Sequence, residues 1–313
     1  MPTLSSRKTI TSLSFVTALL LMVFAINVPH AKSGPGTLSS PYEKMAAEAI
    51  AAHWAKVVDT RSDSQDYPPQ DIADIGTGER LLGGITPHHG LAFPMIVRFY
   101  ETLSQASPEG GMGIKRIFLL SPDHFHQVRN HAAICPEDWT LSESTLQADS
   151  INIQSLTSLS IIDEAVGICA REHGITLHIP MIATYFPNSK LIPLILHPNI
   201  KDVALLSVKE KMESLLGEDT LVILSMDLSH YKTPELMALE DEKTLEVLRT
   251  LKAYETYKLD VDASRAAALT LLIFRDEGAK EGFVQERRDS SFFAGKRVES
   301  GTSYATVFYF KDQ

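Results

Sequence analysis

The sequence contains three short apolar runs, each of which leads directly into histidine or aspartate. Leu82–His89 (LGGITPHH) ends its apolar part at a proline, and two adjacent histidines follow. Apolar runs of this length that are rich in β-branched residues predict buried strands. Because the carboxyl ends of parallel strands meet at one edge of a sheet, we expect the polar residues that follow them to share one pocket. The other two runs are Ile117–Leu120, which leads to His124, and Leu221–Ser225, which leads to Asp227 and His230.

Helical and strand-like segments alternate along the chain, which is typical of a layered α/β fold. Residues 34–313 contain no linker rich in Gly, Ser or Pro and are near the upper size for one hydrophobic core. We therefore expect a single α/β domain in which helices cover both faces of a mainly parallel central sheet. Helices are predicted at 41–58, 93–103, 163–171, 202–216, 234–251 and 262–277, the last with Asp262 as its N-cap, and further strands at 132–135, 190–196 and 303–310.

The first 33 residues have the pattern of an export signal peptide. Basic residues at 7–8 precede an uncharged apolar stretch at 10–28, and the small residues Ala31 and Ser33 precede a cut after Ser33. We therefore expect the mature chain, residues 34–313, to be periplasmic or secreted, with a transient membrane association through the N-terminal segment. The alternative is an uncleaved membrane anchor, because roughly 20 apolar residues span a bilayer.

Charge and cysteine content narrow the classes of partner and site. The formal net charge is −10, from 29 Lys and Arg against 39 Asp and Glu, and the basic residues form no cluster. Nucleic-acid binding needs a concentrated positive face, so we expect a small-molecule or peptide ligand instead. The two cysteines, Cys135 and Cys169, lack a CxxC spacing, and we expect buried thiols rather than a disulfide.

Five segments carry a family resemblance. Pro87-His88-His89-Gly90 is similar to a Pro-His-Ala-Gly motif, and Ser121-Pro122-Asp123-His124 is similar to Gly-Pro-Ser-His. Glu172–Ile175 resembles Glu-His-Ser-Ile, Ser225–His230 resembles Ser-Ser-Asp-(Phe/Leu)-x-His, and Ser303–Ala305 resembles Ser-Tyr-Ala. These motifs, in this order, are those of the Memo-like family, known in bacteria as AmmeMemoRadiSam system protein B.

The resemblance implies a metal site in which His88 and His124 are ligands. Imidazole suits iron, copper and zinc, and two histidines with one carboxylate leave positions open on iron(II). The family places a third ligand, a cysteine, near the start of a late helix, where this chain has Asp262-Ala263-Ser264-Arg265. The interpretation is a divalent metal, iron foremost with copper or zinc as alternatives, completed by Asp227, His230 or Asp262. The alternative is that the metal has been lost.

Two further pairs are candidate catalytic residues. Asp227 and His230 stand three residues apart just past a predicted strand, a spacing that suits a carboxylate orienting an imidazole for proton transfer. They are equally well explained as helix or turn caps. In the family, the pair that corresponds to Glu172 and His173 lines the pocket.

Two functional hypotheses follow from the resemblance. The family fold is similar to that of the class III extradiol dioxygenases, which implies a non-haem metal oxidoreductase, although one fold hosts many functions. The alternative is a non-catalytic protein whose degenerate metal pocket binds a peptide or small ligand. The missing cysteine favours the alternative, and the recurring strand-end histidines favour the enzyme.

Overall fold

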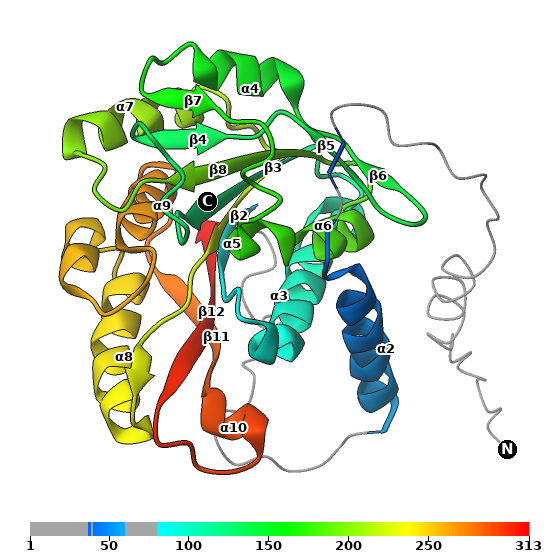
Figure 1. Ribbon diagram of the computed structural model, residues 1–313, viewed down its shortest axis with the longest axis vertical. Helices are drawn as coiled ribbons and strands as arrows, with labels where there is room; N and C mark the ends of the chain where they lie inside the picture. The colour runs from blue at the N-terminus through cyan, green and yellow to red at the C-terminus, as the bar shows by residue number, and fades with distance from the viewer. Residues whose placement is uncertain (1–36, 39, 60–79, 313) are drawn as a thin grey trace, which may run out of the picture. The chain divides into compact units, whose positions relative to one another are not determined.

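The structure, a computed structural model, describes residues 37–38, 40–59 and 80–312. The expected signal peptide, residues 1–33, lies outside this part of the chain. Within the described part, no helix is both long and apolar enough to cross a membrane. The described residues form a mixed α/β domain with a mainly parallel central sheet, as the alternating sequence pattern predicts (Figure 1).

The large sheet has the strand order β10-β12-β2-β9-β3-β8-β4-β7, and β11 pairs with β12. Its centre, β2-β9-β3-β8, is parallel, whereas β12 joins β2 and β4 joins β8 in antiparallel fashion. A smaller sheet has the order β1-β5-β6. The strands are β1 Thr37–Leu38, β2 Arg80–Thr86, β3 Arg116–Pro122, β4 Ala132–Ile134, β5 Asp138–Thr140, β6 Thr145–Leu146, β7 Ile162–Glu164, β8 Lys190–Leu196, β9 Thr220–Ser225, β10 His230–Lys232, β11 Gly282–Asp289 and β12 Gly301–Lys311.

Helices cover both faces of the sheet. Figure 1 shows α3 and α6 on one side and α7, α8 and α9 on the other. The helices are α2 Glu43–Asp59, α3 Phe93–Gln105, α4 Ser150–Thr157, α5 His173–Thr176, α6 Ile179–Tyr185, α7 Asp202–Glu213, α8 Pro234–Arg249, α9 Ser264–Asp276 and α10 Ser290–Ala294, with 3₁₀ turns η2 Gly90–Ala92, η3 Pro108–Gly111 and η4 Ala253–Lys258.

Successive residues of the central strands pack into different cores because side chains alternate across a sheet. In β3, Phe118 and Leu120 belong to the core under α7 and α9, whereas Ile117 and Leu119 face the core under α3 and α6. All four are fully buried. This two-sided burial explains the continuous apolar runs that the sequence shows at β3 and β9.

The parallel register places three chain segments at one edge. Thr86 of β2 pairs with Ser225 of β9, and Leu120 of β3 pairs with Leu224 of β9, so the residues after these strands emerge at the same height. Gly83 permits the close approach of β2 and β9: its φ is +144°, and a Cβ there would lie 1.9 Å from the carbonyl oxygen of Val222.

One expected helix is wrong, and several elements, among them β11, were not expected. The helix expected at 163–171 is instead β7, which pairs in parallel with β4, followed by turns in which Gly167 has a φ of +78°. Tertiary pairing overrides the local helical pattern there. The strand β11 was not expected because Gly282–Asp289 is highly charged. Its Glu286 accepts two hydrogen bonds from Arg98, at 2.8 and 2.7 Å, and its Arg287 donates to Asp241 at 2.7 Å.

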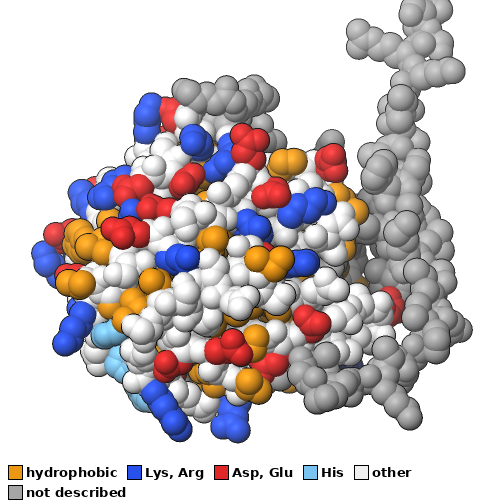
Figure 2. All heavy atoms as spheres, turned by 90° about the horizontal axis from the view of Figure 1, so that it is seen from above, with side chains coloured by type: hydrophobic (Ala, Val, Ile, Leu, Met, Phe, Trp, Pro, Cys, Tyr) orange, Lys and Arg blue, Asp and Glu red, His pale blue; other side chains and the backbone are white. Residues whose placement is uncertain are grey.

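The surface mixes both signs of charge. Figure 2 shows one face on which acidic and basic side chains are interspersed among apolar ones. Exposed charge pairs of this kind contribute little to stability, so the two cores and the sheet are the main sources of the fold's stability.

The two cysteines form a disulfide, contrary to the expectation of buried thiols. Cys135 follows β4, Cys169 lies in the turns after β7, and both are fully buried. The Cys169 N–H also lies 3.2 Å from the Cys135 sulfur. Spacing in the sequence carried no signal for this pairing, because the parallel β4–β7 pair brings the two segments together. The bond closes a loop of 34 residues just before Glu172.

Replacing both cysteines by serine should lower the free energy of unfolding by about 3–4 kcal/mol, since a cross-link over a loop of this length restricts the unfolded chain by about that amount. Urea unfolding followed by circular dichroism would measure the change. The oxidised wild type is the reference, and wild type treated with reductant in urea should match the variant. Equal midpoints for oxidised wild type and the double variant would contradict this role.

Candidate metal centre

His88 is the most buried histidine of the strand-end pocket. It lies two residues past β2, and its backbone N–H donates to Asp227 Oδ1 at 3.0 Å. Ring atom Nδ1 lies 2.8 Å from Ser225 Oγ. Nε2 lies 2.9 Å from Asp262 Oδ2 and 3.8 Å from Asp227 Oδ2, yet no hydrogen bond is aligned on it. His88 therefore presents a buried nitrogen that faces two carboxylates.

Glu172 brings two further histidines to His88. Its carboxylate accepts from the His124 backbone N–H at 3.0 Å and the Gly174 N–H at 3.1 Å, and it lies 2.6 Å from His124 Nδ1. Gly174 is the second residue of α5, and Glu172 is the N-cap of that helix. His173, the first residue of α5, has its Nδ1 3.6 Å from the same carboxylate. The rings of His124 and His173 thereby lie with their centroids 4.0 Å apart and their planes tilted by 34°.

Asp262 lies between His88 and His124. Its Oδ2 is 2.9 Å from His88 Nε2 and 3.5 Å from His124 Nε2, and its Oδ1 accepts from the Asp227 N–H at 3.2 Å. The expectation that Asp262 caps α9 is wrong. The N-cap is Ala263, without a side-chain cap bond, and α9 begins at Ser264. The carboxylate turns instead toward the two imidazoles, which stabilise its charge more than a helix end does.

These residues form two overlapping groups of ligand atoms. One nitrogen each of His88, His124 and His173 lie within 4.8 Å of one another, and so do atoms of His88, Asp227 and Asp262. This bound is close to the separation of roughly 4 Å or less that two ligands of one ion at about 2.0–2.1 Å require. On His88 and His124 the other ring nitrogen contacts a serine or a carboxylate, as is usual for metal-binding histidines. The residues of the site thus fit a metal ion.

Charges in the pocket oppose the effect of burial. Burial acts to lower the pKa of His124, but Asp262 and Glu172 outweigh it and raise that pKa to about 10. The pKa of His88 is raised in the same way by Asp227 and Asp262. Burial, with the charges of His88 and His124, lowers the pKa of His173 to about 4. Without a metal, His173 is neutral and ready to coordinate, whereas His124 must first lose a proton.

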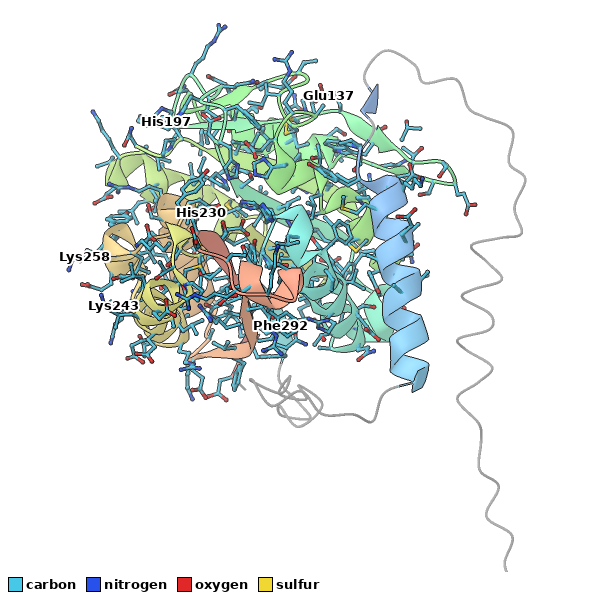
Figure 3. All side chains as sticks on the ribbon, turned by 60° about the horizontal axis from the view of Figure 1, so that its bottom comes forward. Glu137, His197, His230, Lys243, Lys258 and Phe292 are labelled. Carbon is cyan, nitrogen blue, oxygen red and sulfur yellow. A yellow bond between two sulfur atoms is a disulfide. The ribbon has the colours of Figure 1, made fainter. Side chains whose placement is uncertain are left out.

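Asp227 and His230 occupy the other side of the pocket. Asp227 is fully buried, and burial raises its pKa. His230 Nε2 lies 3.9 Å from Asp227 Oδ2, and His230 belongs to neither group of ligand atoms. It begins β10 and is partly exposed, well separated in Figure 3 from His197, which follows β8. Of the three residues expected as candidates to complete the metal site, Asp227 and Asp262 belong to the second group and His230 belongs to neither.

The sequence did not identify the roles of three residues of the site, His173, His178 and Ser225. His173 was expected to line the pocket, not to offer a ligand atom, because nothing in Glu-His-Gly-Ile shows which way the short helix α5 turns. His178 and Ser225 form a hydrogen-bonded pair behind His88 at 3.1 Å. The available signal for His178 was a histidine six residues after Glu172 and two residues before Pro180, which lies in the first turn of a helix.

The sequence matches the profile of the family described as Memo-like protein over residues 69–308. The chain belongs to the Memo-like family. Curated relatives are described as MEMO1 family proteins. That of Ignicoccus hospitalis is 21% identical over 255 residues, which cover 76% of this chain and 87% of the relative. That of Metallosphaera sedula is 25% identical over 258 residues, 77% of this chain and 88% of the relative.

A solved structure of an uncharacterized protein from Escherichia coli K12 is also similar, with a TM-score of 0.44 and 12% identity over 73% of this chain and 99% of that one. The Memo-like profile covers His88, His124, His173, Asp227 and Asp262. The five motifs of the sequence therefore lie within the matched region.

Zinc binding should release at least one proton per ion at pH 8, because the pKa of about 10 keeps His124 protonated and metal binding requires the free nitrogen. For one released proton, the apparent affinity should rise about tenfold per pH unit between about pH 7 and 10. Calorimetric titration in buffers of different ionisation enthalpy counts the protons. Glu172→Gln removes a charge that raises the His124 pKa, so it should reduce the count. Heats that do not depend on the buffer would contradict the assignment.

Proposed function

We propose that this Memo-like protein binds one divalent transition-metal ion through His88, His124 and His173, with Asp262 as the carboxylate ligand. The observation that carries the proposal is the convergence of one nitrogen each of His88, His124 and His173 within 4.8 Å of one another, with Asp262 Oδ2 at 2.9 Å from His88 Nε2 and 3.5 Å from His124 Nε2. A metal ion, which needs both imidazole and carboxylate donors, is the partner that suits this environment.

Asp262 supplies the charge that a cysteine would supply elsewhere in the family. It lies in the segment where the resemblance implies a thiolate, and its carboxylate reaches both His88 and His124. Ser264 has a neutral hydroxyl and is a poor ligand. Because carboxylate and imidazole donors suit harder ions than thiolate does, we propose iron(II) as the physiological metal in preference to copper(I), with zinc as the redox-inert alternative.

We further propose that the protein is a non-haem metal oxidoreductase. Bound iron(II) would supply one-electron chemistry and coordination positions open to a substrate. The chain's own residues would hold the ligands and move protons: Glu172 orients His124, and buried Asp227 faces the partly exposed His230, a pair suited to passing a proton between the pocket and solvent. The substrate class that this pocket suits is a small molecule or peptide segment with an oxygen donor.

Replacing His88, His124 or His173 by alanine should reduce bound metal from about one ion per chain to almost none, because a site with two remaining imidazoles holds the ion weakly. Elemental analysis after loading with iron(II) or zinc and removal of free metal measures this. His197→Ala is the matched control, since His197 also follows a strand at the same edge but belongs to neither ligand group. Full occupancy in all three variants would show that the metal is bound elsewhere.

An oxygen-uptake screen of the iron(II)-loaded protein separates the enzyme from the alternative. Substrate-dependent uptake that His88→Ala abolishes supports an oxidoreductase. Wild-type protein that holds no metal in either loading would instead support a binding protein with a degenerate pocket. Stoichiometric iron without uptake on any substrate class would support a metal-binding role alone.

We propose that the protein acts outside the cytoplasm after loss of residues 1–33. The Cys135–Cys169 disulfide supports this proposal because disulfides form and persist in oxidising compartments and are rare in the cytosol. The basic start, apolar stretch and small residues before Gly34 supply the export pattern.

Amino-terminal sequencing of the native protein, purified from cell fractions, should begin at Gly34, because the cut that the small residues favour follows Ser33. An Ala31→Arg, Ser33→Arg variant should block the cut and retain the longer chain, since bulky charged residues do not suit these positions. A native protein that retains Met1 and requires detergent for extraction would support the membrane anchor.

A further inference from the structure

Behind the candidate metal centre, one serine hydroxyl lies between two histidines. Ser225 Oγ, at the end of β9, is 2.8 Å from His88 Nδ1 and 3.1 Å from His178 Nε2. His178 is the N-cap residue of α6. All three side chains are at most 1% exposed. No other hydrogen-bond partner of Ser225 Oγ is found among the described residues, so its contacts join the two imidazoles.

We infer that Ser225 and His178 are positioning residues that fix the proton of His88 on Nδ1 and so keep Nε2 free to bind the metal. The positioning role in this inference rests on the proposed metal site. The hydrogen-bonded chain itself rests only on the contacts of these three side chains. Neither Ser225 nor His178 belongs to the groups of ligand atoms, and both act through His88.

The direction of the chain follows from the donors that each atom can supply. A neutral histidine has one N–H, and a serine hydroxyl has one O–H and can accept as well. If His88 Nδ1–H donates to Ser225, the hydroxyl can donate onward to His178 Nε2, and every atom in the chain is paired. If His178 Nε2–H donates to Ser225 instead, only His88 Nδ1 is left to accept the hydroxyl. The proton of a neutral His88 must then be on Nε2, 2.9 Å from Asp262 Oδ2, and this nitrogen cannot bind a metal.

Only the first direction therefore leaves Nε2 of a neutral His88 free to bind a metal. It also gives His178 a definite tautomer, with its proton on Nδ1. That nitrogen has no hydrogen-bond partner among the described residues. Burial, followed by the charge of His88, lowers the pKa of His178 well below its usual value, so the ring is neutral and holds one proton. His88 donates through Nδ1 in the same way whether it carries one proton or two.

The packing of α5 holds Ser225 in place. A Cβ on Gly174 would lie 2.2 Å from Ser121 Oγ and 3.2 Å from Ser225 Oγ, so the helix that carries His173 lies directly against both serines. Ser121 is the matched control for Ser225. It is equally buried at the end of a neighbouring parallel strand, but its hydroxyl donates to the carbonyl oxygen of Pro122 at 2.9 Å and forms no hydrogen bond with a histidine among the described residues.

Nitrogen-15 NMR of the metal-free protein tests the chain directly, because protonated and unprotonated ring nitrogens resonate far apart. The His178 signals, assigned by their loss in His178→Gln, should show a proton on Nδ1 in wild type and in Ser121→Ala. In Ser225→Ala the hydroxyl is gone, so the preference for this tautomer should disappear. A proton on His178 Nε2 in wild type would overturn the inference.

Zinc affinity, measured by competition with a chelator, tests whether the hydrogen bonds between His88, Ser225 and His178 strengthen metal binding. Ser225→Ala should weaken binding by about 10–100-fold, the range for groups that orient a metal ligand, whereas Ser121→Ala should bind as wild type does. His178→Leu should weaken binding, and His178→Gln, whose amide oxygen accepts in the place of Nε2, should restore most of it. Melting temperatures show whether each variant is folded. If Ser225→Ala does not fold, the comparison of His178→Leu with His178→Gln still tests the inference.

The two readouts separate this inference from the proposed function. Wild type that binds no zinc but shows the Nδ1 tautomer would overturn the metal site and leave the hydrogen-bonded chain standing. Wild type that binds zinc while Ser225→Ala and His178→Leu bind equally well would overturn the positioning role and leave the metal site standing.

Discussion

The parallel, in-register pairing of β2, β9 and β3 is the constraint on which the pocket depends. Thr86 lies beside Ser225, and Leu120 lies beside Leu224, so the loops that carry His88, Asp227 and His124 leave the sheet at one height. A slip of one residue would turn every side chain of a strand to the opposite face. The apolar alternation of β3 between two cores opposes such a slip, so the cores that stabilise the fold also determine the geometry of the site.

A second requirement is the balance of buried charge. Asp227 and Asp262 are carboxylates in a pocket with little access to water, and isolated charges there would be costly. The imidazoles of His88 and His124 offset that cost, and in doing so they retain protons that a metal must displace. Glu172 likewise raises the pKa of His124. Its carboxylate also accepts hydrogen bonds from the backbone N–H groups of His124 and Gly174, and these bonds join α5 to the loop after β3. The same contacts therefore stabilise the buried charges and hold the imidazoles in the orientation that a bound ion would need.

The sequence predicts those parts of the structure that depend on local patterns of residues. The apolar runs predicted the parallel strands, and the histidines after them indicated the shared edge. It does not predict the features that depend on contacts between residues far apart in the chain. The disulfide requires β4 and β7 to pair, the charged strand β11 requires Arg98 and Asp241 to neutralise it, and Asp262 is drawn from its helix end by imidazoles far away in the chain. His173 faces the pocket because Glu172 and Gly174 fix a short helix whose direction no periodicity shows.

The contact between the His88 backbone and Asp227 joins residues that are 139 positions apart in the chain. Many small metal-binding domains gather their ligands within a few turns of chain, and the ion itself drives their folding. Here the donors come together only when β2, β3 and β9 are already paired, so the sheet must form before an ion can be held by all of them. The proposed ion would thus enter a protein that is already folded, and the fold itself would not require it.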